Sequence, residues 1–406
     1  MKKNLALIIV VVLIIVSIWY IESTKARPGA TDNSNPSQAL NIDAATSSID
    51  VLASSGKNSA VKPSLNISDI AAADKKAGYQ PAIEISNPTD FINASSSFLL
   101  KNLIGKKIIL LDFWTYSCIN CIRTLPYLNS WYQRYRDEGL EIVGIHTPEF
   151  DFEKRYDNVK AATEKFGIKY PVVLDSDYGT WTAYSNQYWP HEYLIDLAGY
   201  IVHDQIGEGN YGETETEIQK LLAERSRVLG VAQGEMLTST VSVPQSNISG
   251  GFLSPETYFG AARNQYLANG VQGTAGSQNL QVPQNISLNS LYLTGSWNFQ
   301  NEYATNNAVG TKIIYKYNAA RVYFVADAPK GATIEIFQDG QPVSAAAAGS
   351  DVHNGKVTIQ ESRLYNIIDN RGNCSPNGVC SDGSSEHTLE IIIDSPGLDA
   401  YTFTFG

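Results

Sequence analysis

The chain has 406 residues, of which 43% are hydrophobic, so it is long enough for two or three globular domains. Its formal net charge is -11, and no block of Lys or Arg occurs after the first three residues. This charge pattern excludes a protein that binds nucleic acid through a basic surface.

The N-terminus has the pattern of a membrane anchor. Two lysines precede an uncharged apolar run over residues 5–21, which ends in Trp19, Tyr20 and an isoleucine. A run of this length can span a bilayer, and the lysines favour a cytoplasmic start. We therefore predict a transmembrane anchor over residues 1–22 and a single-pass cell-membrane protein with its remaining domains on the extracytoplasmic side. A signal peptide cleaved near Ala26 or Ala30 is the alternative, although no A-x-A motif is present.

Residues 23–78 are rich in Ala, Ser, Asn and Asp, and large apolar side chains are sparse. Such a segment cannot bury a core, so we predict a flexible linker. Short apolar patches, such as the one at Ile67 and Ile70, could dock onto a folded domain.

Residues 79–229 predict an α/β domain. The short apolar runs at 106–114 and 140–147 are typical of buried parallel strands, and the segment between them has helical spacing. Together they predict a βαβ unit. The pattern then predicts a helix over 159–168, a strand over 170–175, a hairpin over 188–207 and a closing amphipathic helix over 213–230.

The segment after the first strand contains Cys118 and Cys121 in a C-x-x-C motif. A zinc site is not expected, because the chain has neither a second C-x-x-C pair nor an H-x₃₋₅-H pair. Haem attachment would require His at the position of Ile122. A purely structural disulfide would close a ring too small to constrain the unfolded chain strongly. We therefore expect no metal and no cofactor.

Redox chemistry fits the position of this motif. The pair opens a helix that follows a buried strand, so free backbone N–H groups and the helix dipole would face the sulfur of Cys118. A pKa lowered in this way would make Cys118 the attacking thiolate. Cys121, one turn into the helix, would be shielded and placed to resolve the mixed disulfide.

Four motifs in order carry a family resemblance. The stretch "LLDFWTYSCINC" resembles the redox motif of the TlpA/ResA-like exported thiol–disulfide oxidoreductases. With "GIHTPEFDFE", "WTAYSNQYWPHEYLID" and "GEGNY", the chain is similar to the soluble part of the DipZ-like proteins. The resemblance implies a thioredoxin-like fold and disulfide exchange with partner proteins. We expect the protein to act as a reductant, and the reverse direction, in which it oxidises its partners, stays open.

The resemblance also assigns roles to single residues. Cys118 and Cys121 match the nucleophilic and resolving cysteines, and Trp114 matches an aromatic beside the redox loop. Pro190 matches a cis-proline that faces the cysteines and lets the backbone of Trp189 approach an extended substrate. We therefore expect Trp114, Trp189 and Pro190 in the substrate-binding region.

Two acidic residues are candidates for proton transfer. Asp112 lies on the strand where thioredoxins keep a buried acid beneath the resolving cysteine, and burial would raise its pKa. A partly exposed aspartate at a strand end is an equally open interpretation. Glu149 is the second candidate, because TlpA-like proteins often place an acid after the following strand.

The resemblance also implies partners. The expected clients are exported proteins that carry disulfides. Full-length DipZ-like proteins have a multi-span electron-transfer domain ahead of the soluble part, whereas here a single anchor is predicted. The membrane electron donor would then be a separate protein, similar to CcdA.

Residues 230–251 are a predicted second linker, and residues 252–406 have the short alternating runs of an antiparallel β-sandwich. The resemblance implies a fold similar to carbohydrate-binding modules, but strand aromatics such as Trp297 are expected to pack in the core. Cys374 and Cys380 bracket a turn-rich loop, where we predict a structural disulfide.

A second class of function stays open at this point. The protein would then be a non-catalytic envelope or carbohydrate-binding protein in which the thioredoxin-like domain is a scaffold. Replacing Cys118 separates the two classes, because a binding protein would not depend on its sulfur.

Overall fold

The computed structural model describes residues 66–231, 254–372 and 385–406, which lie within one compact unit that covers residues 61–406. Across these ranges, no helix is both long enough and apolar enough to cross a bilayer. The anchor predicted over residues 1–22 lies outside them and stays a prediction.

The first domain is built on a seven-stranded sheet in the order β1-β7-β6-β3-β4-β5-β2. Strands β3, β4 and β5 are parallel, and the other neighbours are antiparallel. The strands are β1 (Gln80–Pro81), β2 (Asp90–Ile92), β3 (Ile108–Trp114), β4 (Leu140–His146), β5 (Val172–Leu174), β6 (His191–Ile195) and β7 (Tyr200–Ile206).

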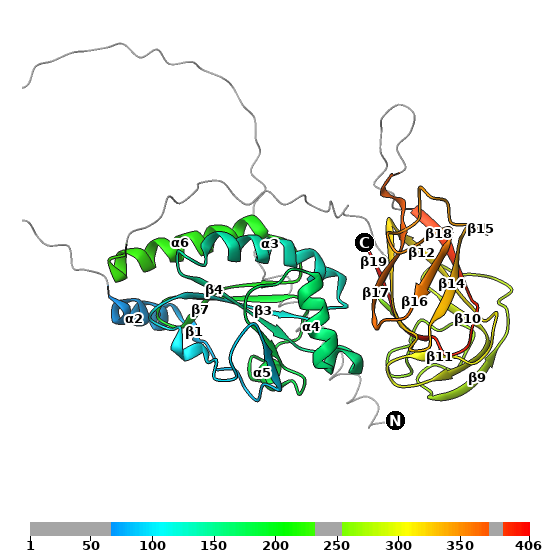
Figure 1. Cartoon of the computed structure of the whole chain (residues 1–406), viewed down its shortest axis with the longest axis horizontal. Helices are drawn as coiled ribbons and strands as arrows, with labels where there is room; N and C mark the ends of the chain where they lie inside the picture. Colours follow the sequence, from blue (N-terminus) through cyan, green and yellow to red (C-terminus); the bar gives the residue numbers. More distant parts are fainter. Residues whose placement is uncertain (1–65, 232–253, 373–384) are drawn as a thin grey trace, which may run out of the picture. The chain divides into compact units, whose positions relative to one another are not determined.

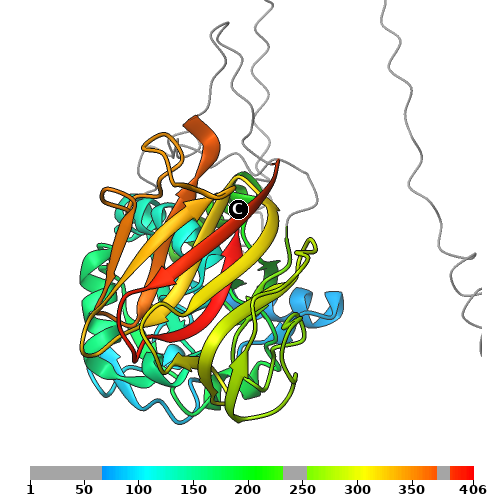
Figure 2. The same ribbon diagram turned by 90° about the vertical axis from the view of Figure 1, so that its right-hand side faces the viewer.

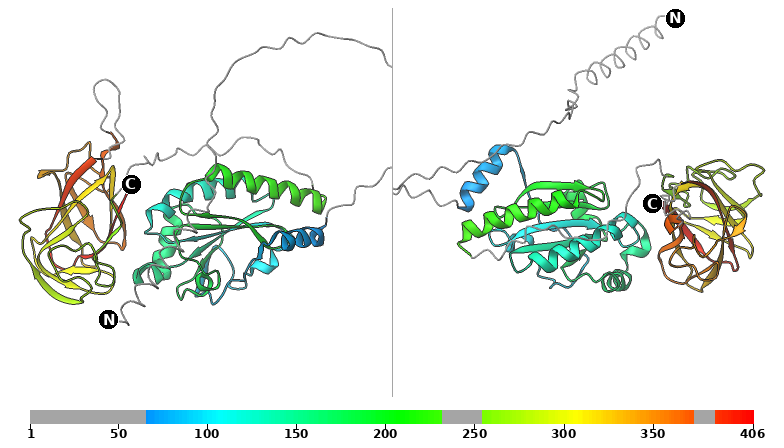
Figure 3. Two further views of the ribbon diagram at one scale, coloured as in Figure 1. Left: turned by 180° about the vertical axis from the view of Figure 1, so that it is seen from behind. Right: turned by 90° about the horizontal axis from the view of Figure 1, so that it is seen from above.

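Helices cover both faces of this sheet. Helices α3 and α6 lie along one face and α5 lies on the opposite side (Figure 1), and Figure 3 shows the same layering from behind. The helices are α3 (Ile119–Tyr135), α4 (Tyr156–Lys165), α5 (Gly179–Ala183) and α6 (Tyr211–Leu229), with 3₁₀ turns η1 (Leu100–Asn102) and η2 (Asp151–Lys154). The predicted βαβ unit, β3-α3-β4, is confirmed.

Alternation along β3 decides which side chains face α3. Ile108, Leu110 and Trp114 belong to the core beneath α3 and α6, together with Trp131 of α3. The odd-numbered residues of β3 belong to a second core on the other face. Because side chains alternate along a strand, Asp112 points into the core beneath α3.

The last part of the predicted linker is wrong, because residues Ile67–Ala77 form helix α2. Asn66 caps this helix by accepting the backbone N–H of Asp69 at 3.0 Å, and Gly78 ends it with φ = 90°. Ile70 is buried, so the predicted docking of the apolar patch is confirmed for this residue. The residues that cap the helix and the buried Ile70 stabilise it, although the polar composition of this segment had predicted a flexible linker.

The second domain is all-β and antiparallel, as predicted, and its strands face the viewer in Figure 2. Its two sheets enclose one apolar core. The strands are β8 (Thr257–Tyr258), β9 (Gly276–Leu280), β10 (Leu291–Phe299), β11 (Ala304–Asn306), β12 (Lys312–Ala319), β13 (Arg321–Asp327), β14 (Ala332–Gln338), β15 (Gln341–Pro342), β16 (Lys356–Ile359), β17 (Arg363–Asp369), β18 (Ser385–Ile393) and β19 (Asp399–Phe405). A 3₁₀ turn, η3 (Asn370–Gly372), follows β17.

Strand β10 passes from one sheet to the other at Gly295. The residues before Gly295 pair with β12, and those from Gly295 onward pair with β9 and β11. Gly295 has φ = 83°, and a Cβ there would lie 2.9 Å from Cγ2 of Thr311. Only glycine fits this backbone without strain, so it marks where the strand changes sheets.

The aromatic residues of this domain mainly form its core. Trp297, Tyr315 and Tyr317 are fully buried, and Tyr323 is buried nearly as well. The prediction that these strand aromatics pack inside is confirmed. Stacking on a sugar is not available to them in this arrangement.

Candidate active site

The turn between β3 and α3 holds the two cysteines. Cys118 is the N-cap residue of α3, with extended backbone (φ = -79°, ψ = 116°), and its sulfur accepts the backbone N–H of Cys121 at 3.3 Å. The predicted position at the helix N-terminus is therefore confirmed. The sulfur takes up one of the N–H groups that a helix leaves unpaired at its start.

The two thiols differ in accessibility. Both are free, but Cys118 is partly exposed whereas Cys121 is buried. Burial raises the pKa of Cys121 well above its usual value, and the hydrogen bond and charge of Cys118 and the charge of Asp112 raise it further. A client disulfide can reach the first sulfur, while the second stays protonated until a base accepts its proton.

The residues before β6 approach Cys118 from the other side of the site. The Trp189–Pro190 bond is cis, as predicted. The carbonyl oxygen of Trp189 lies 3.9 Å from the Cys118 sulfur. The indole of Trp189 lies 4.2 Å from that of Trp181, tilted by 32°, and donates its N–H to the carbonyl of Thr147 at 3.0 Å. Trp189 is thereby fixed beside the reactive sulfur.

Asp112 is almost fully buried, which decides between the two interpretations of its position. Only 1% of its surface is exposed, and burial raises its pKa from 3.8 to about 8. Its charge raises the pKa of Cys121. The acid therefore lies in the core beneath α3, where it can bind or release a proton near neutral pH.

Two acidic residues, Glu149 and Glu153, follow strand β4, and their carboxylates have different partners. Glu149 accepts hydrogen bonds from the Tyr258 hydroxyl at 2.8 Å and from Arg263 at 2.7 Å, so its carboxylate is engaged with the second domain. The fully buried Glu153 instead accepts the backbone N–H of Ser117 at 3.2 Å and its hydroxyl at 2.6 Å. Of the two, Glu153 is the acid that holds the redox loop in place through its hydrogen bonds to Ser117. The proton-transfer role of Glu149 stays a prediction.

Comparison with known proteins gives the family. Residues 80–204 match the AhpC/TSA family, and residues 254–406 match the family described as thioredoxin like C-terminal domain. The chain is 30% identical to the thiol–disulfide oxidoreductase ResA of Bacillus thuringiensis over 134 residues, which cover 31% of this chain and 75% of ResA. The chain belongs to the TlpA/ResA-like thiol–disulfide oxidoreductases.

Two further relatives extend this assignment. The thiol–disulfide oxidoreductase YkuV of Bacillus subtilis is 29% identical over 145 residues, which cover 36% of this chain and 96% of YkuV. Protein DipZ of Mycobacterium tuberculosis is 35% identical over 343 residues, which cover 84% of this chain and 45% of DipZ. The chain thus spans less than half the length of DipZ, but the similarity extends beyond the thioredoxin-like domain.

Trp114 packs beside the redox loop of this TlpA/ResA-like site, as the resemblance implied. It is fully buried, and its ring lies 5.1 Å from His146, nearly perpendicular to it. Its place in the substrate-binding region stays a prediction. Burial also lowers the pKa of His146 to about 3, so this histidine packs as a neutral ring.

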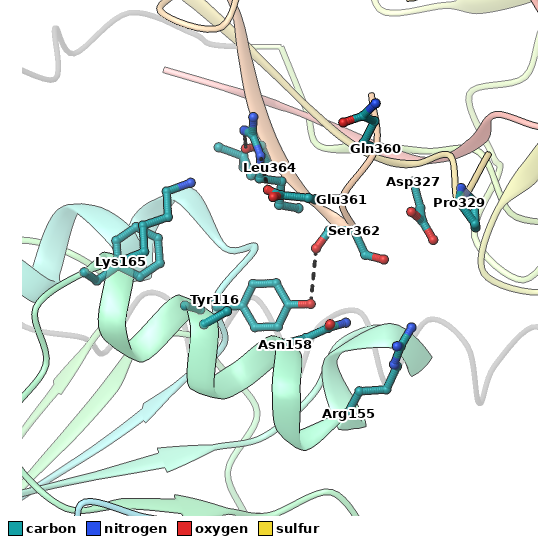
Figure 4. Close-up of a pocket in the computed structure, with 14 residues that line it drawn as sticks. Tyr116, Arg155, Asn158, Lys165, Asp327, Pro329, Gln360, Glu361, Ser362 and Leu364 are labelled. Atoms are coloured by element: carbon teal, nitrogen blue, oxygen red, sulfur yellow. Dashed lines mark hydrogen bonds and ion pairs between the residues drawn. The ribbon is translucent and has the colours of Figure 1, made fainter. Parts of the chain in front are cut away.

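A pocket of about 540 Å³ lies next to the redox loop, on the side of Tyr116. The hydroxyl of Tyr116 donates a hydrogen bond to the carbonyl of Ser362 at 3.2 Å (Figure 4). Charged side chains from both domains, including Arg155, Lys165 and Asp327, line the pocket. Neither Cys118 nor Cys121 is among its lining residues, so we assign it no part in the redox step.

The second cysteine pair cannot be compared with its prediction. Cys374 and Cys380 lie outside the described residues, and their disulfide stays a prediction. Within the described ranges, no group of three or more His, Cys, Asp or Glu side chains is arranged to hold a metal ion.

Proposed function

We propose that this protein is a membrane-anchored, exported thiol–disulfide oxidoreductase that reduces disulfides in exported clients through Cys118 and Cys121. One observation carries the proposal. An accessible sulfur at the N-terminus of α3 lies 3.9 Å from the Trp189 carbonyl, while the second sulfur is buried one turn further along. Attack and resolution need this difference in access.

The reaction follows from this geometry. The Cys118 thiolate attacks one sulfur of the client disulfide, forms a mixed disulfide and releases the other client sulfur as a thiolate. Cys121 then loses its proton and attacks the Cys118 sulfur. The client leaves with both sulfurs reduced, and two electrons have moved from the Cys118–Cys121 pair to the client.

The electrostatics around Cys121 support reduction as the direction. Strong oxidants of this class depend on a stabilised reduced form. Here the Cys121 thiolate is disfavoured by burial and by the charges of Cys118 and Asp112, and the opposing effect is a backbone hydrogen bond at Thr115. Because the negative charge on this sulfur is unfavourable, the reduced form is not stabilised as it is in the strong oxidants. The dithiol therefore gives up its electrons more readily than theirs does.

Anchoring and supply of electrons complete the proposal. The apolar run over residues 5–21 would hold the protein in the cell membrane with its redox domain outside. A reductant in an oxidising compartment has to be re-reduced after each turnover. A separate membrane protein similar to CcdA would supply the electrons.

The redox state of the couple in living cells tests this proposal. The full chain carrying Cys374→Ser and Cys380→Ser is treated with a membrane-impermeant maleimide, so that only Cys118 and Cys121 can react. We expect most molecules to take up one label at the accessible Cys118, and a second at the buried Cys121 only after denaturation, because a reductant is kept as a dithiol. A variant that also lacks Cys118 and Cys121 is the control for background labelling. Couples found mainly as disulfides would contradict the reductant role, and a Cys118 thiol that reacts only after lysis would contradict export.

A further inference from the structure

A second buried acid lies beside Asp112, and sequence reasoning did not identify it. Asp112 of β3 and Glu192 of β6 are directly opposite each other in the antiparallel register. Opposite residues share one face of a sheet, with Cβ atoms about 4.5–5.5 Å apart. Leu194, two residues along from Glu192, belongs to the core beneath α3 and α6, so Glu192 points into that core as Asp112 does.

Both carboxyl groups are buried, and one oxygen of each lacks a hydrogen-bond partner within the described part of the chain. Glu192 is 2% exposed, and among the described residues no hydrogen-bond partner exists for its Oε2 or for Oδ1 of Asp112. Leaving two buried carboxylates without partners is costly, and two charges at this separation would repel each other. A hydrogen bond between one protonated and one ionised carboxyl removes both costs.

The surrounding groups favour Glu192 as the member that keeps its proton. Its pKa is raised well above its usual value, first by burial and then by the charge of Asp112. Asp112 has a pKa of about 8, so it ionises within the physiological range. When Asp112 is ionised, the pair would therefore carry one negative charge, located on Asp112.

No hydrogen bond to Asp112 from the other titratable groups around the pair is seen among the described residues. The titratable side chains that interact electrostatically with the pair are Cys121 from α3, Tyr211 from α6 and Tyr170 before β5. His203 of β7 lies opposite Leu194 in the register, two residues along from Glu192. The hydroxyl of Tyr211 lies 3.2 Å from that of Thr124, and His203 lies 3.4 Å from Thr214. Tyr170 is buried, and the charges of Asp112, Glu192 and Cys121 all raise its pKa.

We propose that protonated Glu192 is a positioning residue that donates a hydrogen bond to Asp112 and so makes Asp112 the acceptor of the Cys121 proton. This inference rests on the proposed function, because it concerns the resolution step. The proton moves from the Cys121 sulfur to the Asp112 carboxylate, and the thiolate forms a bond to the Cys118 sulfur. The bond between Cys118 and the client breaks, and the client leaves as a thiolate. Asp112 returns the proton when the couple is reduced again.

The test isolates resolution from the other steps. In the full chain, Cys118 is first converted to a mixed disulfide with the coloured thiol 2-nitro-5-thiobenzoate, and release of this thiol by Cys121 is followed by stopped flow between pH 5 and 10. We expect Glu192→Leu to slow release roughly tenfold to a hundredfold at pH 7, because the hydrogen bond to the charged acceptor is lost. The pH at which the rate rises should move upward by about one to two units. Glu192→Gln keeps a donor and should remain within about threefold of the wild type.

Matched variants separate the possible failures. Glu141→Leu removes another buried acid of the same sheet, one that is paired with Lys107 at 2.7 Å, and it should leave the release rate unchanged. If Glu192→Leu behaves like Glu141→Leu, or if Glu192→Gln is as slow as Glu192→Leu, the role of Glu192 as a donor is wrong. If Cys121→Ser releases the coloured thiol as fast as the wild type, the proposed resolution by Cys121 itself fails.

An infrared measurement does not depend on activity. A protonated carboxyl group has its own carbonyl band, distinct from that of a carboxylate. At pH 10, where Asp112 is ionised, the wild type should still show this band, and Glu192→Gln should lose it while Glu141→Gln keeps it. A band that is unchanged in Glu192→Gln would overturn the proposal even if Glu192→Leu does not fold.

Discussion

Replacing Cys118 with Ser is expected to reduce disulfide reductase activity to the rate of the reductant alone. A serine hydroxyl is not ionised at neutral pH and cannot form a disulfide with a client. Replacing Cys121 instead should leave the first attack intact, because the partly exposed sulfur of Cys118 does not depend on the buried one for access. The Cys121→Ser protein should accumulate a mixed disulfide with its client and turn over no faster than Cys118→Ser.

Turnover of a disulfide-bearing peptide and non-reducing electrophoresis measure these two outcomes. The double variant Cys374→Ser/Cys380→Ser is the control and should retain activity, because the predicted role of this pair is structural. Cys118→Ser with wild-type turnover would contradict the assignment of the nucleophile. A mixed disulfide that forms through Cys121 in preference to Cys118 would reverse the assigned roles.

Replacing Asp112 with Asn is expected to change how stability depends on pH. The pKa of Asp112 is raised from 3.8 to about 8 in the folded protein by burial. Between these values the folded state binds more protons than the unfolded state, so the wild-type free energy of unfolding should fall as pH rises from about 4 to 8. Each pKa unit corresponds to about 1.4 kcal/mol, so this group costs the wild type roughly 6 kcal/mol above pH 8.

The free energy of unfolding of the asparagine variant should not show this fall with rising pH, because an amide does not ionise. A buried amide without a partner costs about 1–3 kcal/mol at any pH, so Asp112→Asn should be less stable than the wild type near pH 4. Above pH 8 it should be more stable by roughly 3–5 kcal/mol, which is the difference of the two effects. The stability curves of the two proteins should therefore cross between these pH values. A variant that had only lost contacts would be less stable than the wild type at every pH.

Urea unfolding followed by tryptophan fluorescence at several pH values measures this effect. Trp114 and Trp131 lie in the same core as Cys121 and report on the thioredoxin-like domain. Asp137→Asn is the matched control, because the Asp137 side chain is 87% exposed and should change stability by less than about 0.5 kcal/mol. Parallel stability curves for Asp112→Asn and the wild type would contradict the raised pKa.

The elements with strong periodicity could be predicted from the sequence. The apolar runs of β3 and β4 and the helical spacing of α3 each carry their own signal, so the βαβ unit was found. Strands β1 and β2 have only two and three residues, and their pairing with β7 and β5 comes from tertiary contacts. No local pattern marks such short strands. Helix α2 did have a signal, in the Asn66 cap and Gly78, but the polar composition around it was given more weight.

The site was predictable where a motif fixes the position and not where a role depends on neighbours. Cys118, Cys121 and Pro190 follow from motifs, and Asp112 from its place on β3. Glu192 was missed because its importance depends on the register between β3 and β6, which alternation within one strand does not reveal. Glu153 was missed because η2 returns its carboxylate to Ser117. The acid three residues after Phe150, at the third position of this turn, was the available signal.

The reduction potential of the Cys118–Cys121 couple tests the central claim most directly. Residues 66–406 carrying Cys374→Ser and Cys380→Ser are equilibrated with glutathione and dithiothreitol buffers, and the fraction of free thiols is measured. The account predicts a reversible two-electron couple near thioredoxin's value of roughly -270 mV. A potential near DsbA's, roughly -120 mV, would contradict the reductant role, and a pair with no reversible couple would contradict redox function at Cys118 and Cys121 altogether.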